Sequence, residues 1–241
     1  APFLERNGRP PLIDTFNTFT GFPLERIAYN NEQIFESSLF YAHIRDVLMN
    51  GNIDEYNHFL DHIADIIQDP SEIKTNGHLF YSKQGCGKGM LAEFMTRLLG
   101  SSHVISFVNT DAYFNNFNAE QQNKLLKIFE EVSDKGAAFK NHDRLKGDQS
   151  KKTERIESKG IDSTTVKHVA RYWYYTNNES SLYVEGDDRR FTCHKASNKH
   201  ANDTAYFAPI WREMQNTNFC RMAFEYFATR KYTSYSVQNT F

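Results

Sequence analysis

The 241-residue sequence contains only three cysteines, and none of them lies in a C-x-x-C pair. Zinc sites built from cysteine need closely spaced ligands, and small secreted domains held by disulfides contain more cysteine than this. Cys86, Cys193 and Cys220 are far apart in the chain. The sequence therefore offers no cysteine zinc site and predicts a protein of a reducing, intracellular compartment without disulfides.

Long hydrophobic runs are also missing. No apolar run reaches the roughly 18 to 20 residues that a membrane-spanning helix needs, so we expect no membrane association. The first residues lack the charged-then-apolar order of a secretory signal, and the sequence begins with Ala1 rather than Met, which suggests a piece cut from a longer protein. With 15% aromatic residues, the chain is expected to fold around a substantial core.

The formal net charge is only −2, which by itself says nothing about nucleic acid. Its distribution is uneven. Residues 135–199 contain 14 Lys and Arg against 9 Asp and Glu, a balance of +5, while the remainder contains 14 against 21, a balance of −7. A basic segment therefore lies within a mildly acidic protein.

The sequence divides into four expected segments. Residues 1–30 contain four prolines and scattered aromatics, typical of an extended arm. Residues 31–72 show helical spacing over 32–49 and 53–67, with Asn52 as a plausible N-cap. Residues 73–200 are expected to form the core, and residues 201–241 a C-terminal helical segment whose helical pattern covers 204–230.

Within the expected core, short apolar runs alternate with helical patterns. Such alternation predicts an α/β fold with a mostly parallel sheet flanked by helices. A helix is expected over residues 90–99, and strands over residues 78–81, 104–108, 125–129, 171–176 and 190–194.

The glycine-rich run from Ser82 to Gly89 follows a strand and precedes an amphipathic helix, the context of a phosphate-binding P-loop. In such a loop glycines let backbone N–H groups converge on phosphate, and a lysine neutralises charge. The alternative is a glycine-rich turn with an exposed lysine. Ser82 replaces the usual first glycine, and Gly89 replaces the hydroxyl that usually binds Mg²⁺. The predicted ATP-binding residues are Gly85, Cys86, Gly87, Lys88, Gly89 and Met90.

Two carboxylates, Glu130 and Glu131, follow the buried strand pattern of residues 125–129. Ligands bind at the carboxyl ends of strands in such sheets. In a P-loop ATPase the first carboxylate would hold Mg²⁺ and the second would orient or deprotonate the attacking water. The alternative is a solvated helical face with Lys124 and Lys127 as ionic partners.

Two further motifs contain polar groups suited to phosphoryl chemistry. Asn177, with Asn178 as its near rival, ends an aromatic strand and could hold a hydrolytic water; the alternative is an ordinary Asn-rich turn. Arg189 and Arg190 precede another strand, and either could stabilise the transition-state charge in a neighbouring subunit. A surface Asp/Arg ion-pair cluster is the alternative there.

The order of these motifs resembles that of superfamily 3 helicases, especially the helicase half of viral and phage primase-helicase proteins. The resemblance implies an AAA+-like fold in which Lys88 contacts phosphate, Glu130 and Glu131 form the Walker B pair, and Asn177 is the polar sensor. Arg189 and Arg190 match the arginine-finger region. The resemblance to this family further implies a homo-oligomeric ring such as a hexamer and sequence-independent binding of DNA during DNA replication. It also implies a possible primase domain in the full-length protein.

The same family places a DNA-gripping hairpin between the acidic pair and the sensor. Here Gly160 suits the hairpin turn and Lys159 its tip. Lys146, Arg155 and Lys159 are the expected DNA contacts, because basic side chains bind phosphates without distinguishing bases. A solvated Lys-rich loop is the alternative.

Three functions remain open from the sequence: an ATP-driven DNA helicase, a P-loop kinase, and a nucleotide-binding assembly module without turnover. The helicase explains the whole ordered set of motifs. The kinase leaves the acidic pair and the basic hairpin without a purpose, and Ser82 and Gly89 motivate the module without turnover.

Overall fold

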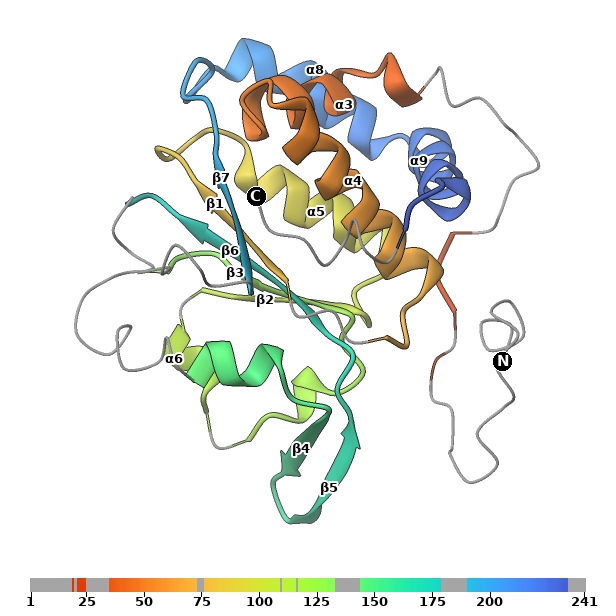
Figure 1. Cartoon of the computed structure of the whole chain (residues 1–241), viewed down its shortest axis with the longest axis vertical. Coiled ribbons are helices and arrows are strands. Elements are labelled where there is room, and N and C mark those ends of the chain that lie inside the picture. Colours follow the sequence, from red (N-terminus) through yellow and green to blue (C-terminus); the bar gives the residue numbers. More distant parts are fainter. Residues whose placement is uncertain are drawn as a thin grey trace.

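The structure is a computed structural model, and it describes residues 19, 21–24, 35–72, 76–108, 110–115, 117–132, 144–178 and 190–233. A five-stranded sheet in the order β2-β3-β6-β1-β7 forms its centre, and all four strand pairs are parallel (Figure 1). A separate antiparallel pair, β4-β5, projects away from this sheet. The strands are β1 (Gly77–Tyr81), β2 (Val104–Phe107), β3 (Leu126–Phe129), β4 (Thr153–Ser158), β5 (Ile161–Lys167), β6 (Arg171–Thr176) and β7 (Phe191–Lys195).

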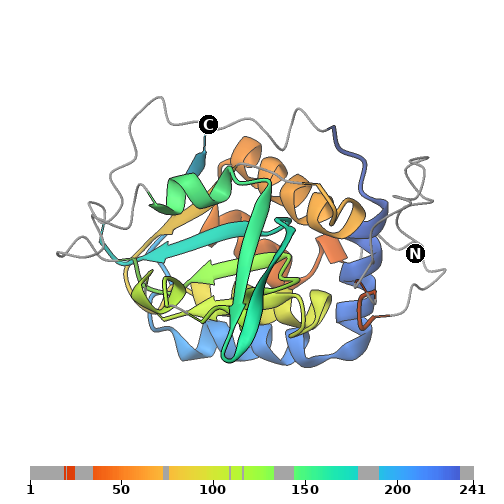
Figure 2. The ribbon, with the colours of Figure 1, turned by 90° about the horizontal axis from the view of Figure 1, so that it is seen from below.

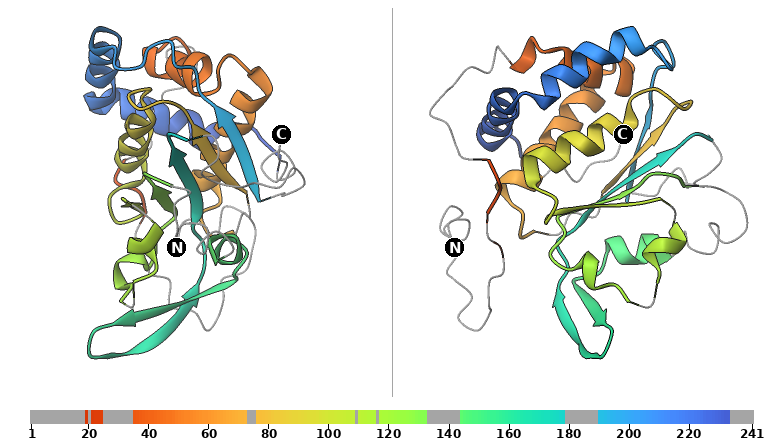
Figure 3. Two further views of the ribbon diagram at one scale, coloured as in Figure 1. Left: turned by 90° about the vertical axis from the view of Figure 1, so that its left-hand side faces the viewer. Right: turned by 180° about the vertical axis from the view of Figure 1, so that it is seen from behind.

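Helices cover both faces of the sheet. On one face lie α3, α4, α5, α8 and α9; the other face carries α6, the helical residues 144–149 and the β4-β5 hairpin (Figures 1 and 3). Seen from below, the hairpin crosses in front of the sheet (Figure 2). The helical elements are α3 (Leu39–His43), the π-helix η1 (Ile44–Leu48), α4 (Ile53–Gln68), α5 (Lys88–Leu99), α6 (Thr110–Tyr113), the 3-10 helix η2 (Ala119–Gln121), α8 (Thr204–Gln215) and α9 (Thr217–Thr229).

Alternation along the strands supplies each face with its own core, because successive side chains in a strand point to opposite faces. On β6, Trp173 and Tyr175 pack with the larger group of helices, whereas Tyr172 and Tyr174 pack with Tyr113 of α6 and Leu145. All six residues of β6 are buried, as expected for a strand inside a covered parallel sheet.

The predicted α/β class with a parallel sheet and flanking helices is confirmed. The predicted N-cap also forms, since the Asn52 side chain accepts hydrogen bonds from the backbone N–H groups of Asp54 and Glu55. In the described part of the chain, no helix is both long and apolar enough to cross a membrane.

Two regions of expected helix are divided in the structure. Residues 204–230, where the helical pattern was expected, form two helices, because the chain breaks at Asn216. Asn216 ends α8, and its side chain caps α9 by accepting from the N–H groups of Asn218 and Phe219. The helix expected over residues 32–49 is α3 continued by η1, and residues 32–34 lie outside the described part.

Most of the expected N-terminal arm, residues 1–30, also lies outside the described residues. Of its described residues, Phe22 stacks edge-on against Phe224 of α9 at a centroid distance of 5.4 Å. Phe19 lies against His103 at 5.1 Å.

Candidate nucleotide-binding site

The loop between β1 and α5 has the backbone of a tight phosphate-type turn. Gly85 and Gly87 have φ angles of +83° and +89°, a region that favours glycine. A Cβ on Gly85 would overlap the Asn202 side chain, and a Cβ on Gly87 would lie 2.6 Å from Nε2 of His43. The two glycines are therefore required by backbone conformation and by close packing.

Lys88, the first residue of α5, is held by several acceptors. Its Nζ donates to Oγ of Ser82 at 2.6 Å, to the Ser82 carbonyl at 3.1 Å and to Oδ1 of Asn177 at 3.0 Å. Burial lowers the pKa of the Lys88 ammonium, and Cys86 opposes this shift. The bond to Asn177 joins two residues that are 89 positions apart in the sequence.

Asn177 directly follows β6, and β6 lies beside β1 in the sheet, with Thr176 in register with Tyr81. The predicted sensor therefore lies next to the predicted phosphate loop. Asn178 does not line the cleft described below; its backbone N–H bonds to Oγ1 of Thr176 instead.

A cleft of about 890 Å³ opens at this edge of the sheet. Every predicted ATP-binding residue from Gly85 to Met90 lines it, together with Glu130, Glu131 and Asn177. The two glutamates follow β3 directly and are exposed, which excludes the alternative of a helical face. The structure thus brings the phosphate loop, the acidic pair and the predicted sensor into one cavity.

The acidic pair provides carboxylate oxygens for a divalent cation. Among the described residues no group of three or more His, Cys, Asp or Glu side chains is arranged to bind a metal. Two exposed carboxylates and a cleft suit Mg²⁺, which keeps several waters and is commonly bound through one or two carboxylates plus substrate phosphates. Gly89 contributes no hydroxyl, and the space beside its Cα is open, with no atom within 4 Å of an added Cβ.

Part of the cleft was not predicted from the sequence. Phe207 and Trp211 of α8 form one wall, and Asn202, whose backbone N–H donates to the Gly85 carbonyl at 3.1 Å, lies at its edge. Asn198 supports the loop by accepting from the Lys83 N–H at 2.9 Å. The only sequence signal was an Asn-containing turn after a strand, which does not differ from an ordinary surface loop.

Tyr175 was also missed, because on β6 it reads only as a core aromatic. The residue lines the cleft, and its hydroxyl is buried and has no hydrogen-bond partner among the described residues. Burial, followed by the charge of Glu130, raises the pKa of Tyr175. Tyr175 lines the same cleft as Glu130 and Glu131.

Arg190, one of the two predicted arginines, does not line this cleft. Arg190 lies in the turn before β7, and its neighbour Phe191 pairs with Gly77 at the amino end of β1. The phosphate loop follows the opposite, carboxyl end of β1. Arg190 therefore lies at the far end of the sheet from its own cleft, and Arg189 lies outside the described residues.

The basic hairpin forms where it was expected. β4 and β5 pair antiparallel, and the connection is Lys159-Gly160, with Gly160 at φ +75°. Lys159 and Arg155 are exposed. Lys146 is different and requires a correction: it lies in the helical residues 144–149, outside the hairpin, and only 6% of it is exposed. A buried side chain at this position does not fit the expected DNA contact.

Comparisons with known proteins agree with this arrangement at the level of the fold. A family model described as a family of unknown function, DUF5906, matches residues 80–190. Among curated protein sequences none matches the chain.

Solved structures of the C-terminal region of NrS-1 are similar to this chain. One apo structure has a TM-score of 0.75 at 20% identity, covering 92% of this chain and 52% of the other. Another, the A form, has a TM-score of 0.75 at 21% identity, covering 94% and 53%. The chain therefore spans about half the length of the structures that it matches.

Proposed function

We propose that the protein is an ATP hydrolase that moves along DNA, a helicase of the superfamily 3 type acting in viral or phage DNA replication. The observation that supports this most strongly is the bond from Lys88 to Asn177 inside a cleft that Glu130 and Glu131 also line. A lysine, a sensor amide and two carboxylates around one cavity are the groups that phosphoryl transfer from ATP to water requires.

Each residue has a distinct role in this proposal. Lys88 releases the Asn177 oxygen and binds the β- and γ-phosphates, and the loop from Gly85 to Gly89 donates backbone N–H groups to them. Glu131 accepts a proton from the attacking water, and Asn177 orients that water against the γ-phosphate. Because Lys88 is already held by neutral oxygens, phosphate oxygens replace existing ligands of a pre-positioned ammonium.

Mg²⁺, bound by Glu130 and water, would neutralise charge on the phosphates. Gly89 leaves that ion without a hydroxyl ligand from the protein. Open space beside Gly89 is compatible with an additional water at this point. We therefore expect turnover that depends on Mg²⁺.

The position of Arg190 fits the ring expected from the resemblance. An arginine at the amino end of β7 lies at the end of the sheet opposite the cleft of its own chain, so any role at a cleft would be at that of a neighbouring copy. In a ring, each cleft would be completed by Arg189 or Arg190 of the next subunit, and hydrolysis would move the hairpins. Lys159 at the hairpin tip and Arg155 are exposed to contact DNA phosphates.

The test is the rate of ATP hydrolysis by the purified chain with and without single-stranded DNA. Lys88→Ala removes the phosphate ligand, and Glu131→Gln keeps the size of the side chain but removes its basicity. We expect hydrolysis that DNA stimulates in the wild type and a loss of about 100-fold or more in both variants. Lys83→Ala is the matched control, because Lys83 is an exposed lysine of the same loop.

One observation favours a second candidate, a nucleotide-binding module without turnover. Gly89 and Ser82 both depart from the usual P-loop pattern. Such a module would bind ATP tightly in both the wild type and Glu131→Gln and hydrolyse it in neither. Absence of DNA-stimulated hydrolysis from a folded protein at every oligomeric state tested contradicts the helicase and leaves this module.

A further inference from the structure

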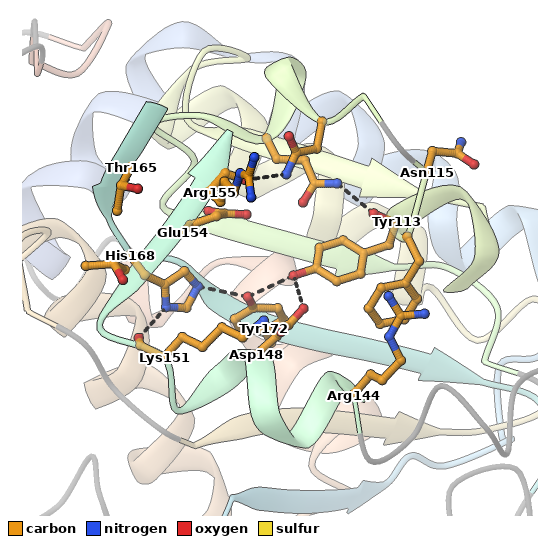
Figure 4. Close-up of a pocket in the computed structure, with 14 residues that line it drawn as sticks. Tyr113, Asn115, Arg144, Asp148, Lys151, Glu154, Arg155, Thr165, His168 and Tyr172 are labelled. Atoms are coloured by element: carbon orange, nitrogen blue, oxygen red, sulfur yellow. Dashed lines mark hydrogen bonds and ion pairs between the residues drawn. The ribbon is translucent and has the colours of Figure 1, made fainter. Parts of the chain in front are cut away.

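A second cavity lies at the base of the β4-β5 hairpin, on the opposite face of the sheet from α4 and α5. We call it the hairpin-base pocket (Figure 4). Its volume is about 370 Å³. Its walls come from five parts of the chain: α6 with the following residues, η2, the helical residues 144–149 with Lys151, the hairpin with His168, and β6 through Tyr172. None of its lining residues belongs to the nucleotide cleft.

The floor of this pocket is a connected polar network. Lys127 of β3 is fully buried, and its Nζ lies 2.5 Å from Oε1 of Glu154 on β4. The Tyr113 hydroxyl donates to Asp148 at 2.9 Å and lies 3.3 Å from the Tyr172 hydroxyl. These bonds fix the floor and compensate the negative charge of Glu154.

Tyr172 is held from the other side by His168, whose Nε2 is 2.8 Å from the hydroxyl. Burial lowers the pKa of His168, with the nearby Lys127 as the next cause, so this histidine is neutral at pH 7. Asp148 is paired with Lys151. Both carboxylates of the pocket therefore have a cation beside them.

The opening of the pocket carries three basic side chains. The guanidinium of Arg144 lies 3.9 Å above the Phe114 ring, and within the part of the chain that the structure describes it makes no ion pair. Stacking on an aromatic ring orients an arginine while its N–H edge remains available for phosphate. Lys151 and Arg155, with side chains 58% and 70% exposed, lie on the same rim, where Lys151 pairs with Asp148 and Arg155 with Glu157.

The pocket is also joined directly to the hairpin. Asn118 donates to the Arg155 carbonyl at 2.9 Å and accepts from the Glu157 N–H at 2.7 Å, which fixes β4 against η2. A ligand in the pocket therefore contacts both the hairpin and the elements that hold it.

We propose that the hairpin-base pocket binds one nucleotide, with its base inside the cavity and its phosphate against Arg144 and the basic rim. The volume lies at the lower end of small-molecule pockets, which suits a single nucleotide. This inference rests on the proposed DNA-binding function. Because the pocket lies at the base of the hairpin, its nucleotide would belong to a DNA strand that runs along the hairpin. A free mononucleotide has the same chemistry.

The test uses the 241-residue chain carrying Phe114→Trp together with Lys88→Ala, which removes the phosphate ligand of the nucleotide cleft. Phe114→Trp places an indole against Arg144, and stacking or close approach of a base quenches its fluorescence. Phe117→Trp is the matched control, because Phe117 is 59% exposed and does not line the pocket. Oligothymidylate and thymidine monophosphate are titrated separately, so that quenching by the first alone identifies a strand and quenching by the second identifies a free nucleotide.

A second arm measures the affinity for oligothymidylate when Arg144 is replaced. Arg144→Ala should weaken binding about five- to tenfold and lower the salt dependence by about 0.7, the slope of one phosphate contact on a single strand. Arg45→Ala, which removes a partly exposed arginine of η1 that pairs with Asp46 on the other face of the sheet, should change neither.

The two proposals fail in different ways. If neither ligand quenches the Phe114→Trp indole and Arg144→Ala binds DNA as the wild type does, the pocket is not a nucleotide site. The proposed helicase function stands in that case if DNA still stimulates ATP hydrolysis. If quenching occurs and Arg144→Ala weakens binding, the pocket is a nucleotide site, even where ATP is never hydrolysed and the helicase is contradicted.

Discussion

His43 makes a quantitative prediction about stability at acid pH. The residue lies beneath the phosphate loop and is fully buried. Its Nδ1 is 3.2 Å from the Tyr206 hydroxyl, and its Nε2 has no partner in the described structure. Burial, with His200 as the second cause, lowers the pKa of His43 from 6.5 to about 4.

The sign of the effect follows from proton binding. Below pH 6.5 the unfolded chain takes up a proton at His43 that the folded protein does not. The free energy of unfolding therefore decreases as the pH is lowered from 6.5 to about 4. A shift of about 2.5 units corresponds to roughly 3.4 kcal/mol in total, of which about 2 kcal/mol is lost at pH 5.

The assay is urea unfolding of the wild type and of His43→Gln at pH 7.5 and pH 5. The glutamine does not titrate, whereas His78, whose pKa burial also lowers, is present in both proteins and cancels in the comparison. At pH 7.5 the wild type should be the more stable. Its advantage should shrink by about 2 kcal/mol at pH 5. An advantage that stays the same at both pH values would refute the burial of a neutral His43.

Two further predictions concern the phosphate loop and the floor of the hairpin-base pocket. Gly87→Ala should lower the free energy of unfolding by about 1 kcal/mol or more and abolish ATP binding, because Gly87 has a positive φ and lies close to His43. Gly89→Ala should fold normally, because the space beside Gly89 is open. Urea unfolding and calorimetry of ATP binding compare the two variants, and equal behaviour contradicts the prediction. Lys127→Met should destabilise the fold by about 3 kcal/mol, because it leaves the negative charge of Glu154 without its partner. Adding Glu154→Gln should recover part of that loss. Additive losses in thermal unfolding would show that the two side chains do not interact.

Helices and strands could be predicted from the sequence where the hydrophobic periodicity and the flanking turn or capping residues indicate the same element. The run before Ser82 and the amphipathic pattern after Gly87 specify strand and helix, and the capping role of Asn52 follows from its residue type alone. The break at Asn216 could not be found in the same way. Apolar residues continue at helical spacing on both sides of it, so only the observed cap shows where one helix ends and the next begins.

For the candidate site, adjacency in the sheet decided what the sequence could predict. Strand ends in a parallel sheet meet at one edge, so Glu130 and Asn177 were expected close to the phosphate loop, and they line its cleft. Long-range packing was not predictable. The α8 wall with Trp211, the contact of Asn202 with Gly85, and the burial of Lys146 depend on how distant segments fold against one another.

The central claim is that the cleft holding Lys88 and Glu131 hydrolyses ATP. The most direct measurement is phosphate release from ATP, with Mg²⁺ and single-stranded DNA, by the wild type and by Glu131→Gln, after equilibrium binding has shown that both proteins bind ATP equally well. We expect release from the wild type and at least a 100-fold slower release from the variant. Equal rates from the two proteins, or no release from either, would contradict the claim.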